Sequence, residues 1–224
     1  MHTNFVSAVK YYASSIPTLL SGLDFWRVPI LLILRPIRLI TNGGLRFYVG
    51  SIMDVWLLKE VLLDRQYEQR KGIRPGDTVI DIGAGIGDFA VLASKKALRV
   101  FSYEQDSKKA GLVRKNIRLN NCQNVHFSHS EVRSLDQIFK ENGIEWCDFL
   151  KIDCEGCEYA IFAGASEGTL SRIEHIAMEV HLFTPQMEQQ YANLKDCLIR
   201  NRFEIKELPN PVHRSLRLVF ADRE

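Results

Sequence analysis

The chain has 224 residues, of which 46% are hydrophobic and 25% are charged, so it can bury a core and lacks the composition of a disordered protein. Its 29 basic and 27 acidic residues give a net charge of +2, which is too balanced to indicate a nucleic-acid partner. The five cysteines lack the spacing of a disulfide framework, and no secretory signal is recognised. We therefore expect a cytoplasmic protein.

Residues 1–71 are predicted to form an N-terminal helical extension. Apolar residues within 51–70 recur at close to helical spacing, and no strand pattern is apparent in this part of the chain. A turn at 74–77, Arg-Pro-Gly-Asp, follows. We place the boundary there, so that 72–224 is the main domain.

Residues 16–40 are strongly apolar, but arginines and prolines interrupt them before the ~20 residues that a spanning helix needs. Residues 1–50 also carry five basic side chains against a single acid, Asp24. We interpret this segment as packing on its own domain. The alternative, a peripheral contact of 16–40 with an anionic membrane surface, stays open. The sequence predicts no oligomeric state.

After residue 72, short apolar strands alternate with helices. Strands are expected at 78–82, 99–103, 125–128, 149–152, 173–180, 203–207 and 215–220, with helices at 86–98, 107–120, 135–140, from 159, and at 187–201. This alternation predicts an α/β fold of parallel βαβ units. No helix separates the last two strands, so we expect a mostly parallel seven-stranded sheet with a terminal antiparallel strand.

A glycine loop, Asp81-Ile-Gly83-Ala84-Gly85-Ile-Gly87-Asp88, joins the first of these strands to the next helix. Glycines there allow a sharp turn and the close approach of a ligand to the backbone. A dinucleotide-binding loop would carry a third glycine where Asp88 stands. The Asp81 carboxylate would repel a pyrophosphate but attract the ammonium of S-adenosylmethionine (AdoMet). The loop therefore favours AdoMet, with an NAD-type oxidoreductase as the alternative.

Two further segments are predicted to complete the cofactor site. Glu104, at the end of the second strand, can accept hydrogen bonds from the ribose hydroxyls, although it could also be a charge at a helix start. Ser130 and Glu131 follow the third strand, where an adenine ring is expected, although they could also cap a helix. The predicted cofactor-binding residues are Asp81, Gly83, Ala84, Gly85, Gly87, Glu104, Gln105, Ser130, Glu131 and Asp153.

An acidic motif, Lys151-Ile-Asp153-Cys-Glu155-Gly-Cys-Glu158, follows the fourth strand. The carboxyl ends of parallel strands carry the ligand crevice, so these carboxylates should face the cofactor. The Cys-x-x-Cys pair at 154 and 157 allows a redox or zinc interpretation. We instead expect small side chains packed beneath the loop, because no second pair or suitably spaced histidine accompanies it.

The sequence resembles the FkbM-type methyltransferases. The resemblance rests on the glycine loop, on Tyr103-Glu-Gln-Asp, Asn116-Ile-Arg-Leu-Asn and Glu179-Val-His, and above all on the acidic motif. It spans about residues 75–185, outside the extension. It implies a Rossmann-like class I methyltransferase that uses AdoMet and typically methylates a hydroxyl. The implied acceptor is a small metabolite, a sugar or a lipid-linked molecule.

A hydroxyl acceptor loses a proton on methylation, so a base is expected near it. His181, after the fifth strand, is the first candidate, with Asp153 and Glu155 as alternatives. These carboxylates and His181 could instead hold a divalent cation, but we predict no metal. The remaining alternative is a non-catalytic, membrane-associated protein that retains the fold.

Overall fold

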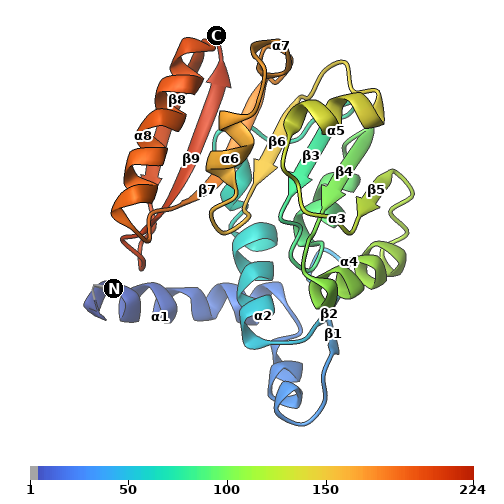
Figure 1. Cartoon of the computed structure of the whole chain (residues 1–224). Coiled ribbons are helices and arrows are strands. Elements are labelled where there is room, and N and C mark those ends of the chain that lie inside the picture. The colour runs from blue at the N-terminus through green and yellow to red at the C-terminus, as the bar shows by residue number, and fades with distance from the viewer. Residues whose placement is uncertain (1–4) are drawn as a thin grey trace.

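The computed structural model describes residues 5–224 and contains a seven-stranded sheet in the order β5-β4-β3-β6-β7-β9-β8 (Figure 1). The strands are β3 (Thr78–Ile82), β4 (Arg99–Tyr103), β5 (Val125–Ser128), β6 (Phe149–Ile152), β7 (His175–His181), β8 (Phe203–Pro209) and β9 (Leu216–Arg223). Strands β3 to β7 pair in parallel, and β9 runs antiparallel to both β7 and β8. The predicted α/β class and mostly parallel sheet are confirmed. The reversed strand ends the chain but lies inside the sheet.

Alternating side chains of the strands face two separate hydrophobic clusters. Val79, Val100 and Phe149 pack on the face that carries α3 and the N-terminal extension. Ile80, Phe101 and their neighbours pack on the opposite face, against α5, α6 and α8. This is the period-two geometry of a strand covered on both sides. The helices of the main domain are α3 (Asp88–Ser94), α4 (Ser107–Leu119), α5 (Leu135–Asn142), α6 (Glu158–Ala163), α7 (Glu167–Leu170) and α8 (Pro185–Arg200).

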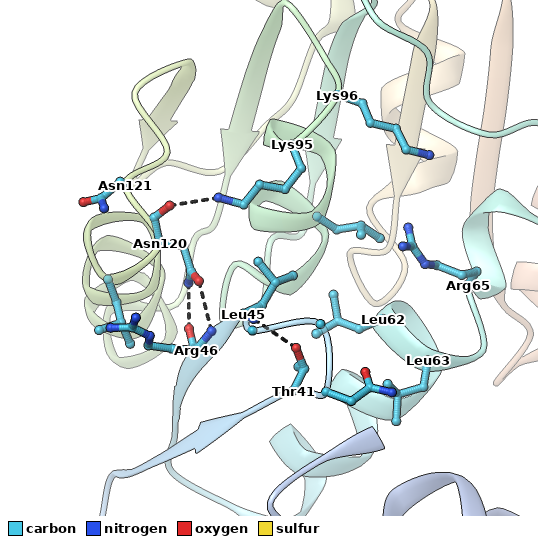
Figure 2. Close-up of a pocket in the computed structure, with 15 residues that line it drawn as sticks. Thr41, Leu45, Arg46, Leu62, Leu63, Arg65, Lys95, Lys96, Asn120 and Asn121 are labelled. Atoms are coloured by element: carbon cyan, nitrogen blue, oxygen red, sulfur yellow. Dashed lines mark hydrogen bonds between the residues drawn. The ribbon is translucent and has the colours of Figure 1, made fainter. Parts of the chain in front are cut away.

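The extension is not wholly helical, so that prediction is wrong in one place. Its helical segments are α1 (Phe5–Gly22), η1 (Phe25–Leu32), α2 (Ile52–Leu58), η2 (Lys59–Leu63) and η3 (Gln66–Glu68). Between them β1 (Ile37–Ile40) and β2 (Arg46–Val49) form an antiparallel hairpin. Asn116 of α4 pairs through its side-chain amide with the backbone of Tyr48. Asn120, which caps the end of α4, pairs in the same way with the backbone of Arg46 (Figure 2). Partners about 70 residues away in sequence thus complete this hairpin, and local periodicity does not reveal them.

The extension shares one hydrophobic cluster with the main domain. Leu19 and Leu58 belong to the same buried group as Val79 and Phe89, so apolar contacts cross the expected boundary near residue 72. In Figure 1, α1 and α2 lie on the side of the sheet where the parallel strands end. None of the helices in residues 5–224 is long and apolar enough to cross a bilayer.

Candidate active site

The three glycines of the loop after β3 all have positive φ angles but have different surroundings. A Cβ atom at Gly83 would collide with the carbonyl oxygen of Asp153, so this position brings two loops into direct contact. A Cβ at Gly87 would lie 3.2 Å from Val113 of α4, which makes Gly87 a packing position. Gly85 faces open space, and its amide donates to Glu104 Oε2 at 2.8 Å.

A cavity of about 450 Å³ opens over the carboxyl ends of β3, β4, β5 and β6. That volume is within the range of small-molecule and cofactor sites. Seven predicted residues line it, and they are Gly83, Glu104, Gln105, Ser130, Glu131, Asp153 and Glu155. Glu104 is 6% exposed and accepts hydrogen bonds from the amides of Gly85 and Asp106, both at 2.8 Å. The open glycine turn beside this fixed carboxylate fits the nucleoside and amino-acid parts of AdoMet.

Asp81, Ala84, Gly85 and Gly87 were predicted to bind cofactor but do not line this cavity. Asp81 is fully buried, and its carboxylate lies 3.1 Å from Lys151 Nζ and accepts a hydrogen bond from Ser102. Lys151 also donates to the carbonyl oxygen of Gly83. The Asp81 charge therefore balances a buried lysine beneath the loop, which corrects the expectation of an ammonium contact.

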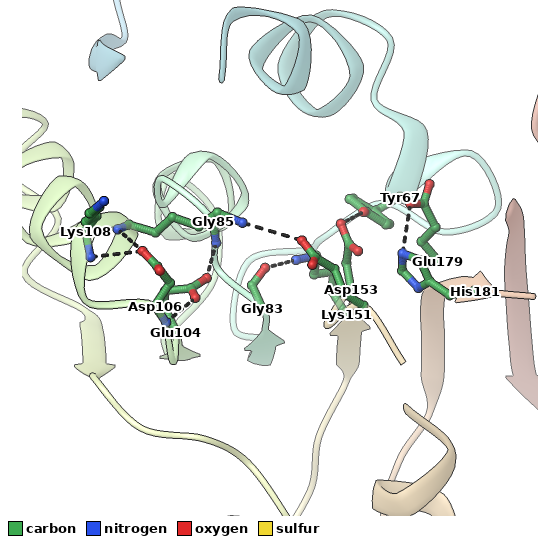
Figure 3. Close-up of polar contacts among 12 residues, drawn as sticks. Tyr67, Gly83, Gly85, Glu104, Asp106, Lys108, Lys151, Asp153, Glu179 and His181 are labelled. Atoms are coloured by element: carbon green, nitrogen blue, oxygen red, sulfur yellow. Dashed lines mark hydrogen bonds and ion pairs between the residues drawn. The ribbon is translucent and has the colours of Figure 1, made fainter. Parts of the chain in front are cut away.

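A second polar group lies next to the cavity, at the ends of β6 and β7 (Figure 3). Asp153, Glu179 and His181 each place one ligand-type atom within 4.8 Å of the others. Tyr67 of η3 donates to Asp153 Oδ2 at 2.9 Å, and His181 Nε2 lies 3.6 Å from Glu179 Oε1. Asp153 thus belongs both to this group and to the cofactor cavity. We call these four residues the acceptor-side cluster.

Burial and like charge set the protonation of this cluster. Burial raises the pKa of Glu179, and the Asp153 carboxylate adds to the increase. For His181, burial alone would lower the pKa, but the Glu158 hydrogen bond and the surrounding carboxylates raise it above its usual value. Burial and the Asp153 charge raise the pKa of Tyr67, so its hydroxyl stays a donor near neutral pH.

Glu158 of α6 lies against both the backbone and the ring of His181. Its Oε1 atom accepts the backbone amide of His181 at 3.1 Å and lies 3.4 Å from the imidazole Nδ1. The His181 side chain is 5% exposed, and Nε2 is the ring nitrogen that faces Glu179. An imidazole with a carboxylate near each ring nitrogen is suited to proton transfer.

Two sequence expectations for the acidic motif need correction. Glu155 is 76% exposed, lies 3.6 Å from Lys109 and stands outside the acceptor-side cluster, so its predicted role as a base has no geometric support. Cys154 and Cys157 are joined by a disulfide, whereas we expected unpaired side chains. Both cysteines line the cofactor cavity.

Sequence reasoning missed Tyr67, Glu179 and Lys151 as functional residues. Glu179 stands two residues before His181 on β7, so a strand's period of two placed them on one side of the sheet. Lys151 lies inside the acidic motif. Tyr67 has no local signal, because it comes from the extension and reaches Asp153 only in the folded chain.

Two family descriptions match overlapping parts of the chain. Residues 41–145 match the TRM5/TYW2 methyltransferase domain, and residues 128–205 match the FkbM methyltransferase domain. Among curated proteins, the AMB antimetabolite synthetase AmbE of Pseudomonas aeruginosa is 28% identical over 177 residues, or 77% of this chain. The chain spans only 8% of the length of AmbE.

Solved structures share the fold. A protein from Streptococcus mutans assigned as a methyltransferase, in complex with SAH, superposes with a TM-score of 0.55 at 15% identity, covering 68% of this chain and 91% of that one. An rRNA methylase from Streptococcus thermophilus gives a TM-score of 0.51 at 12% identity, covering 76% and 94%.

The fold, the cofactor cavity and these matches define a class I AdoMet-dependent methyltransferase, with AdoMet as its cofactor. Within that class, residues 128–205 match the FkbM methyltransferase domain, which agrees with the resemblance seen in the sequence. The matched residues 128–205 include both the acidic motif and the Glu179-Val-His181 segment.

Proposed function

We propose that this chain transfers the methyl group of AdoMet to a hydroxyl of a small or lipid-linked acceptor, with His181 as the base. The observation that carries the proposal is the acceptor-side cluster beside the cofactor cavity, in which Nε2 of His181 faces Glu179. The other imidazole nitrogen lies 3.4 Å from Glu158, outside the cluster. When bound, AdoMet supplies an electrophilic methyl group on a sulfonium.

The residues of the chain have three separate tasks in this proposal. Glu104 and the backbone around Gly83 hold the cofactor, which fixes the position of the reacting carbon. Tyr67 is a positioning residue, because its hydroxyl orients the Asp153 carboxylate between the two sites. Nε2 of neutral His181 receives the proton of the acceptor hydroxyl, and the Glu158 carboxylate, 3.4 Å from Nδ1, stabilises the imidazolium that results.

The base is tested by replacing His181 with Asn and, as a matched control, His126 with Asn. His126 lies on the edge strand β5 and stacks on Phe101, away from the site. We expect His181→Asn to lower the rate of methyl transfer by about 10²–10⁴-fold while affinity for S-adenosylhomocysteine changes less than about twofold. The control should keep both properties. An unchanged rate in His181→Asn would contradict the assignment.

The rate should also depend on pH in a defined direction. His181 accepts a proton only when neutral, and its pKa is raised, so the wild-type rate should increase with pH through a midpoint above the usual histidine value of ~6.5. The residual activity of His181→Asn should lack this rise.

The acceptor class is tested by AdoMet consumption in the presence of hydroxylated metabolites, lipid-linked sugars, matched amines and RNA transcripts. Turnover with a hydroxylated or lipid-linked compound and with none of the others would support the proposal. Methylation of RNA alone, the substrate class named for the Streptococcus thermophilus structure, would replace it. Binding of S-adenosylhomocysteine without any turnover would favour a non-catalytic protein.

A further inference from the structure

The outer side of the N-terminal extension is unusually apolar. Nine of the fifteen large hydrophobic side chains that are exposed in the described part of the chain lie within residues 9–34. Scattered exposed hydrophobic residues are normal on a protein surface, but a concentration in one short stretch marks an interaction site. We call the exposed apolar side chains of α1 and of residues 26–34 the N-terminal apolar surface.

Helix α1 has apolar residues on its outer side as well as on its buried side. Val9, Tyr12, Ile16 and Leu20 follow the spacing of one helical face and are 44–61% exposed. Ala8 and Leu19 face the interior. A helix on a water-exposed domain normally presents polar residues outward. The outer face of α1 is therefore suited to contact with an apolar partner.

The segment that follows α1 extends this surface. Leu32 is 80% exposed, Ile33 is 84% exposed and Leu34 is 61% exposed. Trp26 is 71% exposed, with the Arg27 guanidinium 4.9 Å from its ring. Since α1 and η1 contact each other, these side chains adjoin the exposed face of the helix. Protruding aliphatic residues beside a tryptophan suit the boundary between lipid headgroups and acyl chains.

Charge around this surface favours an anionic partner. Lys10, Arg35 and Arg38 are exposed and take part in none of the ion pairs found among residues 5–224. The one acid of residues 1–50, Asp24, lies 3.1 Å from Arg27, which neutralises it. Basic side chains around exposed apolar ones are the combination that binds membranes containing acidic lipids.

We propose that the N-terminal apolar surface docks this protein on a membrane rich in anionic lipids. The fold then determines how the docked molecule is oriented relative to the membrane. Helix α1 joins the site side of the sheet through Tyr11, which donates to Glu60 at 2.9 Å, and it lies where the parallel strands end (Figure 1). Docking on α1 therefore turns the side that carries the acceptor-side cluster toward the lipid. The docking itself does not depend on which acceptor is methylated.

Vesicle flotation of the full chain tests the proposal. We expect it to float with phosphatidylcholine vesicles that contain phosphatidylglycerol, to float less with phosphatidylcholine alone, and to be released as salt rises. The double variant Leu32→Glu/Ile33→Glu should weaken partitioning at least about tenfold, because it places two charges where apolar groups insert. The control Leu98→Glu/Ile199→Glu changes two other exposed hydrophobic side chains, 61% and 60% exposed, elsewhere on the molecule and should float like wild type.

The fluorescence of Trp26 provides a second measurement. Its emission in wild-type protein should shift to shorter wavelength when anionic vesicles are added, and Trp26→Phe should abolish that shift. A full chain that stays at the bottom of the gradient, or a control variant that loses as much binding as Leu32→Glu/Ile33→Glu, would overturn the proposal. So would a stable dimer in solution that shows no Trp26 shift, since a second copy would then cover the surface.

Discussion

Gly83 is the residue at which the glycine loop and the acidic loop meet. Its φ of +79° lies in the region that only glycine adopts readily, and the Asp153 carbonyl occupies the space that a Cβ would need. Both constraints apply at once, so neither a backbone adjustment nor a side-chain movement relieves them. Glycine is therefore required at position 83 because two loops that are 70 residues apart in the sequence contact each other there.

We expect Gly83→Ala to destabilise the protein by about 1–3 kcal/mol and to abolish measurable binding of S-adenosylhomocysteine. The matched control is Gly111→Ala in α4, where a Cβ would meet nothing within 4 Å. That change should stabilise the protein by about 0.5–1 kcal/mol, because alanine favours a helix interior. Urea unfolding and calorimetric titration measure the two effects. Equal behaviour of the two variants would refute the steric explanation.

Asp88 should make stability depend on pH. Burial raises its pKa to about 7, although Lys151 and a backbone hydrogen bond act in the opposite direction. The native state then retains a proton that the unfolded chain has released, so the contribution of this group falls as pH rises from about 4 to about 7.

The side chain in Asp88→Asn is neutral at every pH, so this variant should lose the decrease in the free energy of unfolding between about pH 4 and about pH 7. That decrease is about 4 kcal/mol at most for a shift of about three pKa units. Urea unfolding at pH 4.5 and 7.5 measures the change. Asp196→Asn, an exposed site on α8, is the control and should retain the wild-type slope. If Asp88→Asn keeps that slope as well, Asp88 is not the group responsible.

At the scale of elements, the hairpin of the extension is held by side chains from the end of α4. Asn116 and Asn120, which belong to a family motif with no role assigned from sequence, bind the backbone of β2. They anchor the extension that supplies Tyr67 to the cluster. The motif therefore holds the extension in place, and it affects the site only indirectly, through the position of Tyr67.

The disulfide in the loop between β6 and α6 should affect ligand binding more than global stability. It closes a loop of four residues, and chain-entropy reasoning gives about 2 kcal/mol for so short a loop. Both cysteines line the cofactor cavity, so reduction should weaken S-adenosylhomocysteine binding several-fold. Titration with and without dithiothreitol measures this, and Cys154→Ala/Cys157→Ala should not respond to the reductant. A reductant effect that persists in this variant would place the sensitive group elsewhere, among Cys122, Cys147 and Cys197.

At the scale of the whole molecule, the extension packs against one face of the sheet. Leu58 and Phe47 are fully buried in the same cluster as Val79, Phe89 and Phe149. Removal of residues 1–71 would expose this apolar face and would also remove Tyr67.

A fragment of residues 72–224 should therefore unfold without a cooperative transition, or aggregate, and should not bind S-adenosylhomocysteine. Circular dichroism with thermal denaturation compares it with the full chain. A fragment with a sharp transition and wild-type affinity would show instead that the main domain is independent.

The strands of the main domain, their parallel order and the cofactor class could be predicted from sequence. Alternating apolar strands and helices restrict the topology strongly, and the glycine loop and acidic motif are local in sequence. The hairpin at β1 and β2 could not be predicted, because four-residue strands carry little periodicity and their outer partners come from α4. The buried role of Asp81 was missed for a similar reason, since Lys151 is adjacent only across the sheet.

The sequence alone thus determined the class of protein, because the residues that define it are contiguous motifs at the ends of regular strands. Tertiary structure decided which residues share a site. It brought Tyr67, Asp153, Glu179 and His181 together, moved Asp81 and Glu155 out of their predicted roles, and placed α1 on the side of the sheet where the parallel strands end. The physical reason is that proton transfer, charge compensation and membrane docking depend on distances and burial between segments far apart in the chain, and local patterns carry no information about those.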